Sequence, residues 1–178
     1  TEESKEVIYA YGMELLISDV LNTIIVLLIA LFSHTLPAVV VFIAVFMGLR
    51  QFVGGFHANS HLSCMFTLVM VMMVFSYGIC NVSGHITPIF SISFIMIALP
   101  IILCIAPVPH PNKPMSEEKS VKLRKRSCIL AVTLSVVTIA LLVFQYQKLS
   151  LYVSSGMLLS AIMALLGHFL NRGDNSKR

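Results

Sequence analysis

The sequence predicts an all-α, polytopic membrane protein with about six transmembrane helices and an amphipathic N-terminal segment. Of its 178 residues, 57% are hydrophobic and 11% are charged, whereas soluble domains carry about 25% charged residues. Several uncharged runs reach the length of about 20 residues that spans a bilayer. Basic residues are confined to a few short segments between these runs. These observations exclude a soluble globular protein and indicate a single membrane domain over residues 1–178.

The first segment, residues 1–19, mixes charged and apolar side chains. Five acidic residues and one lysine alternate with apolar residues such as Val7, Ile8 and Leu15. This mixture is typical of a helix that lies in the membrane interface rather than one that spans the bilayer. We therefore expect an interfacial amphipathic segment here.

Residues 20–49 form an uncharged run of 30 residues that contains Pro37. Proline inside a helix costs about 3 kcal/mol, so this run predicts two helices joined by a tight turn at residues 33–37. The second helix has only 13 residues before Arg50, or about 20 Å against a hydrocarbon core of about 30 Å. We expect it to continue to Gly55, with Arg50 reaching toward the interface. One long tilted helix is the alternative, and it reduces the number of spans to five.

Four further uncharged runs predict the remaining spans. They are residues 62–84, 86–106, 128–147 and 149–170, with 23, 21, 20 and 22 residues respectively. Each is long enough to cross the hydrocarbon core as a helix.

The basic residues predict the orientation of these spans. In the six-span arrangement, 11 of the 12 Lys and Arg residues lie on one side of the membrane, and Lys148 lies on the other. Cytoplasmic loops carry such an excess of basic residues. Both termini and the segments 50–64 and 107–127 are therefore predicted to be cytoplasmic. A five-span arrangement would place Lys5 alone on the far side.

Residues 50–64 form a polar segment between apolar runs, and it contains His57 and Cys64. A free thiol has a pKa of about 8.5 and an imidazole one of about 6.5, so together they supply a thiolate nucleophile and its acid partner. On a continuous helix the two would be about 10.5 Å apart along the axis, beyond the roughly 3 Å that proton transfer needs. We therefore expect the chain to turn at Gly54 and Gly55 and bring His57 back toward Cys64.

Two other interpretations of the same segment remain open. His57 and Cys64 are alternatively an interfacial histidine and an ordinary apolar-facing cysteine. Together with His61, they have the spacing of metal ligands on one helix face, which would suit a metal permease or a peptide exporter. The spans hold almost no ionisable residues, which argues against a transporter. The sequence thus predicts neither a metal site nor another cofactor.

The segment 107–127 combines several prolines with a basic cluster, and we expect it to form a cytoplasmic loop. Prolines favour extended backbone over its first part. The basic cluster comprises Lys122, Arg124, Lys125 and Arg126. These side chains suit either anionic lipid head groups or an acidic peptide, and the residues alone favour a topology anchor at the lipid head groups.

The order of these residues resembles the accessory gene regulator B (AgrB) family, the membrane peptidases of Gram-positive quorum sensing. The resemblance rests on Arg50, the pair Gly54 and Gly55, His57 and Cys64, followed by the proline loop that contains Lys113 and Pro114. It implies that His57 and Cys64 form the catalytic pair. The residues that it places around the site, in substrate-binding or site-shaping roles, are Arg50, Gly54, Gly55, Lys122, Arg124, Lys125 and Arg126.

The resemblance also implies a function. The expected activity is that of a cysteine endopeptidase, which cleaves an autoinducer propeptide and supports its cyclisation to a thiolactone or lactone through an acyl-enzyme thioester. The expected partners are a propeptide with an acidic C-terminal part, membrane lipids and a second copy of the chain, and no nucleic acid. The expected location is the bacterial cell membrane.

Overall fold

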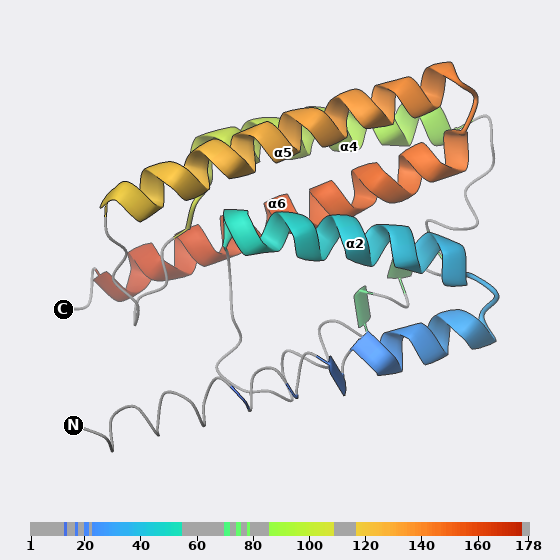
Figure 1. Ribbon diagram of the computed structural model, residues 1–178, viewed down its shortest axis with the longest axis horizontal. Helices are drawn as coiled ribbons and strands as arrows, with labels where there is room; N and C mark the ends of the chain where they lie inside the picture. The colour runs from blue at the N-terminus through green and yellow to red at the C-terminus, as the bar shows by residue number, and fades with distance from the viewer. Residues whose placement is uncertain are drawn as a thin grey trace. The chain divides into compact units, whose positions relative to one another are not determined.

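The computed structural model (Figure 1) describes part of the 178-residue chain. The described residues are 13, 17, 20–21, 23–54, 70–71, 74–75, 78, 86–108 and 117–175. They fall into two compact units. Unit 1 holds the described residues up to Val39 together with those between 70 and 78, and unit 2 holds residues 40–54, 86–108 and 117–175.

Unit 1 contains a short apolar helix, Thr23–Phe32, and the turn that follows it. His34 adopts a left-handed conformation with φ 55°, and Thr35 donates its N–H to the Ala30 carbonyl at 2.9 Å. These features close the helix end in the manner of a Schellman motif. The hydroxyl of Ser33 lies 2.8 Å from that of Thr35 and also donates to the Ile29 carbonyl. The predicted tight turn between two helices is therefore confirmed.

Four described helices are long and apolar enough to cross a membrane. They are α2 (Leu36–Val53), α4 (Thr87–Ile105), α5 (Glu117–Val143) and α6 (Gln147–Asn175). Their most apolar windows have mean hydropathies of 2.1, 2.6, 2.2 and 1.9. The predicted all-α membrane class is confirmed. The count of about six spans stays a prediction, because the segments 1–19 and 62–84 lie mainly outside the described residues.

The predicted loop over residues 107–127 is shorter than expected, because α5 already begins at Glu117. Glu117 and Glu118 occupy its first turn, where acidic side chains interact favourably with the helix dipole. The lysines and arginines that follow are good helix formers, and no proline occurs after Pro114. The basic cluster is thus helical. The prediction failed because a membrane helix was expected to begin where charge ends.

The turn between α5 and α6 is short. Gln145 has φ 65°, and Tyr146 donates its N–H to the Leu141 carbonyl at 2.8 Å. This again caps a helix through a left-handed residue. The turn reverses the chain direction between α5 and α6.

Helix α6 is the most buried of the four helices. Over half of its spanning window is buried, 56% against 22% for both α4 and α5. It packs against α4 and α5 (Figure 1), and the Ser160 hydroxyl lies 3.5 Å from the Phe46 carbonyl of α2. The small residues Ser154, Ser155, Gly156 and Ser160 of α6 are all buried. Small side chains let membrane helices approach closely.

Unit 2 has two distinct ends. At one end, near the α5–α6 turn, the hydroxyls of Ser91 and Ser150 lie 3.1 Å apart and join α4 to α6. At the other end, the last residues of α2 and α4 meet, and α5 begins (Figure 1). The predicted site residues that the structure describes all lie toward this second end.

Candidate active site

The structure describes only part of the predicted site. Arg50 and Gly54 lie at the end of α2. Gly55, His57 and Cys64 lie outside the described residues, so the predicted catalytic pair stays a prediction. The residues that lead into this segment, at the end of α2, are described.

Gly54 ends α2 and turns the chain. Its φ is +73°, in the left-handed region that glycine adopts without a Cβ penalty. Its N–H still donates to the Arg50 carbonyl at 3.1 Å, so the turn follows directly on the last helical residues. The predicted turn at Gly54 is confirmed.

A second segment, residues 106–108, pairs with the end of α2. Val108 donates its N–H to the Val53 carbonyl at 2.9 Å, and Gly54 and Val108 form an isolated parallel β-bridge. A Cβ on Gly54 would lie 2.6 Å from the Val108 carbonyl oxygen, closer than real Cβ contacts allow. Both its φ and this close approach therefore require glycine at position 54. We call residues 106–108 the strap.

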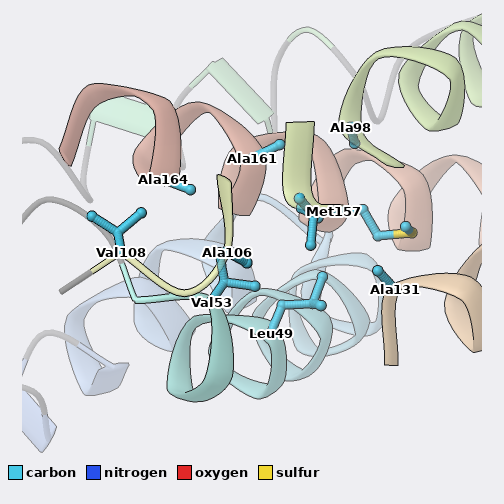
Figure 2. Close-up of a cluster of buried hydrophobic side chains, with 10 residues drawn as sticks. Leu49, Val53, Ala98, Ala106, Val108, Ala131, Met157, Ala161 and Ala164 are labelled. Carbon is cyan, nitrogen blue, oxygen red and sulfur yellow. The ribbon is translucent and has the colours of Figure 1, made fainter. Parts of the chain in front are cut away.

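The strap and the end of α2 belong to the hydrophobic core of unit 2. Leu49, Val53, Ala106 and Val108 are buried in one cluster with residues of α4, α5 and α6 (Figure 2). Met157 of α6 lies in the same cluster. The first residues of the candidate site are therefore fixed by packing as well as by hydrogen bonding.

Arg50 lies in the last turn of α2 and is partly buried. Its guanidinium carbon is 5.6 Å from the centroid of the Phe46 ring, the geometry of a cation–π interaction. Phe46 in turn stacks on Phe42, with centroids 6.3 Å apart and an interplanar angle of 13°. A cation near a helix C-terminus is also favoured by the helix dipole. Arg50 is thus held against α2 at the helix end that leads to His57.

The basic cluster occupies the first turns of α5. All four of its side chains, Lys122, Arg124, Lys125 and Arg126, are exposed. Because α-helical residues three and four apart share a face, Lys122, Lys125 and Arg126 lie on one side of α5. On another side, Ser127 is buried and donates to the Arg124 carbonyl at 2.9 Å. The cluster therefore presents several positive charges on an accessible helix surface.

Sequence reasoning missed the strap. The prolines around Val108 predicted extended backbone, but neither periodicity nor charge indicated which segment it pairs with. The alternative metal site cannot be compared with the structure, because His57, His61 and Cys64 all lie outside the described residues. Among the residues that are described, no group of three or more His, Cys, Asp or Glu side chains could hold a metal ion.

Comparison with known proteins identifies the family. The model of the family AgrB, Accessory gene regulator B, matches residues 1–164. An AgrB-like protein of Clostridium beijerinckii is 24% identical over 116 residues, which cover 64% of this chain and 56% of that protein. The chain thus spans little more than half the length of this curated relative. No solved structure matches the chain. Because the family match extends over most of the sequence, the chain belongs to the accessory gene regulator B family.

Proposed function

We propose that this chain is a membrane-embedded cysteine endopeptidase that matures a small autoinducer propeptide. The observation that carries the proposal is that His57 and Cys64 occur, with Arg50 and the Gly54–Gly55 pair, in a chain of the AgrB family. Family membership supports a role in accessory gene regulation. Cys64 as the nucleophile and His57 as its base would supply the chemistry of peptide cleavage.

In the first step, His57 accepts the proton of the Cys64 thiol, and the thiolate attacks a backbone carbonyl of the propeptide. The C–N bond breaks, and His57 returns the proton to the leaving amine. The C-terminal fragment departs as a free amine, and the N-terminal part remains on Cys64 as a thioester. No cofactor takes part in this step.

In the second step, a cysteine thiol within the bound peptide gives its proton to His57 and attacks the thioester. A new thioester forms within the peptide, the Cys64 thiolate leaves, and the product is a thiolactone ring. A serine hydroxyl would give a lactone by the same route. Exclusion of water at the membrane interface would protect the acyl-enzyme from hydrolysis.

The two steps differ in free energy. The second exchanges one thioester for another and is nearly balanced. The first step converts a stable amide into a high-energy thioester and has an unfavourable free energy, so it must be coupled to a favourable later step. Removal of the released fragment, or preferential binding of the cyclic product to lipid, would do this.

The remaining parts of the proposal concern binding and location. Arg50 would hold a substrate carboxylate or shape the site, together with Gly54 and Gly55. The exposed basic cluster on α5 would attract an acidic C-terminal part of the propeptide. Eleven of the 12 basic residues lie on one side in the six-span arrangement, which supports a cytoplasmic site in a bacterial cell membrane. A second copy of the chain would complete the assembly as a homodimer.

The test uses purified protein in lipid vesicles with a synthetic propeptide. Cys64→Ala should abolish cleavage, and His57→Ala should slow it by about 10²–10⁴-fold, the usual contribution of a general base. In the parent protein, mass spectrometry should find the N-terminal peptide fragment attached to Cys64. Undiminished cleavage in either alanine variant would remove that residue from the mechanism. Stoichiometric metal together with an unreactive Cys64 would favour a permease instead.

A further inference from the structure

We propose that Val108 is a positioning residue for His57. Its backbone N–H holds the end of α2, and thereby the start of the segment that carries His57. This inference rests on the proposed function, because it assigns Val108 a role in the chemistry of His57 and Cys64. It concerns a contact between two segments 54 residues apart in the sequence, Gly54 and Val108.

The N–H of Val108 donates a hydrogen bond to the Val53 carbonyl, which has no partner within α2 because it lies in the last turn of the helix. The last four carbonyls of a helix have no partner within the helix. The Val53 carbonyl accepts from Val108 at 2.9 Å, and the two residues are 0% and 6% exposed. Losing this bond would leave two polar groups shielded from water and without a partner, which is unfavourable. The end of α2 is therefore held in one place.

Gly54 makes this pairing possible and also sets the direction in which the chain continues. With φ +73°, it turns the backbone out of the helix, and its hydrogen atom faces the Val108 carbonyl oxygen, where a Cβ would come within 2.6 Å. Any other residue would separate Gly54 from the strap. The exit direction of the chain therefore depends on the contact with Val108.

The distance along the chain makes this constraint relevant to catalysis. His57 follows Gly54 by three residues, and three residues extend over at most about 11 Å. A base must lie within about 3 Å of the proton that it accepts, and a displacement of about 1 Å can cost 10²-fold in rate. Fixing the backbone at position 54 thus limits where the imidazole can reach.

The experiment measures the reactivity of Cys64 with iodoacetamide and so requires no substrate. The parent background retains Cys64 as its sole cysteine, since Cys80, Cys104 and Cys128 are replaced by alanine. Alkylation rates are recorded against pH in lipid nanodiscs. In the parent, the rate should reach its plateau well below about 8.5, the pKa of a free thiol, and His57→Ala should abolish this shift.

Two variants disrupt the strap contact. Val108→Pro removes the N–H donor, and Gly54→Ala introduces the clash with the Val108 carbonyl. Both should give the alkylation profile of His57→Ala, with the low-pH rate reduced at least tenfold. Two matched controls should keep the parent profile. Val108→Ala retains the donor, and Gly48→Ala adds a Cβ in the same helix where nothing lies within 4 Å.

The outcomes separate this inference from the proposed function. If the parent and His57→Ala have the same profile, the proposed catalytic pair fails. If those two differ but Val108→Pro and Gly54→Ala retain the parent profile, the positioning role of Val108 is overturned. Should both variants fail to fold, hydrogen exchange on the parent decides. A Val108 amide as protected as the last turn of α2 supports the strap, and one that exchanges like a free amide overturns it.

Discussion

The backbone of Gly156 in α6 lies directly against the Phe42 carbonyl in α2. A Cβ added to Gly156 would be 3.0 Å from that carbonyl oxygen and 3.0 Å from Cγ1 of Val45. Four residues further along α6, the Ser160 hydroxyl donates to the Gly156 carbonyl at 3.0 Å and lies 3.5 Å from the Phe46 carbonyl. The close approach of α2 to α6 therefore depends on small residues. Since α2 carries Arg50 in its last turn and leads directly into Gly54, this contact also supports the candidate site.

Gly156→Ala should destabilise the protein. Overpacking a well-fitted contact costs about 1–3 kcal/mol, and the higher helix propensity of alanine offsets at most about 1 kcal/mol of it. The control is Gly48→Ala in α2, whose added Cβ meets nothing within 4 Å and which should keep or raise the stability. Thermal unfolding in detergent measures both. Equal melting temperatures for the two variants would contradict the close packing of α2 on α6.

The buried hydroxyls of Ser91 and Ser150 should couple only weakly. They lie 3.1 Å apart, but each also lies within hydrogen-bond distance of a carbonyl in its own helix, at 3.0 Å for Thr87 and 2.7 Å for Gln147. Two hydroxyls carry two protons, so the three contacts cannot all be formed at once. A double-mutant cycle with Ser91→Ala and Ser150→Ala should give a coupling energy of about 0.6 kcal/mol. A coupling energy of several kcal/mol would show that the Ser91 and Ser150 hydroxyls bond mainly to each other and not to the carbonyls of their own helices.

Substitutions of Arg50 should distinguish the effect of its positive charge from the effect of its planar guanidinium group. Arg50→Gln removes the interaction with Phe46, which is worth about 0.5–1 kcal/mol, and should lower the melting temperature slightly. If Arg50 holds a substrate carboxylate, this variant should also raise KM for the propeptide about tenfold or more. Arg50→Lys keeps the charge but loses the planar guanidinium, so its KM should be intermediate. Phe46→Leu is the control, and it should affect stability more than KM.

Neutralising the basic cluster should weaken the binding of an acidic substrate in a salt-dependent way. Replacing Lys122, Arg124, Lys125 and Arg126 together with glutamine should raise the apparent KM at low ionic strength. The difference from the parent should shrink near 1 M salt, where the Debye length falls to about 3 Å. Lys148→Gln, in the first turn of α6, should leave KM unchanged. If this variant has the same KM as the parent at low salt, the basic cluster does not bind the substrate and only determines the membrane topology.

Thiol labelling can test the orientation of α5. Glu118 and Tyr146 are both exposed and lie near opposite ends of this helix. In a chain without its four native cysteines, Tyr146→Cys should react with a membrane-impermeant maleimide in intact cells. Glu118→Cys should react only after lysis. The reverse pattern would place the basic cluster outside the cell and would exclude a cytoplasmic site.

The sequence predicted those parts of the molecule that depend on local composition. Uncharged runs located α4 to within a residue or two, because the cost of placing charge in hydrocarbon acts on each segment separately. Pro37 and the glycine at position 54 predicted two turns that the structure contains, since both residue types act on their own backbone. The start of α5 was wrong, because a helix can extend beyond the membrane into a charged segment.

By itself, the sequence determined the membrane class, the apolar part of each described span and, through the order of Arg50, His57 and Cys64, the expected chemistry. Only the tertiary structure decided that α6 is the most buried of the four described spans, that Gly156 meets Phe42, and that Val108 pairs with the end of α2. The reason is physical. Hydropathy and turn preference are properties of residues that are adjacent in the sequence. These contacts instead depend on whether surfaces that are far apart in the sequence fit closely enough to exclude both lipid and water.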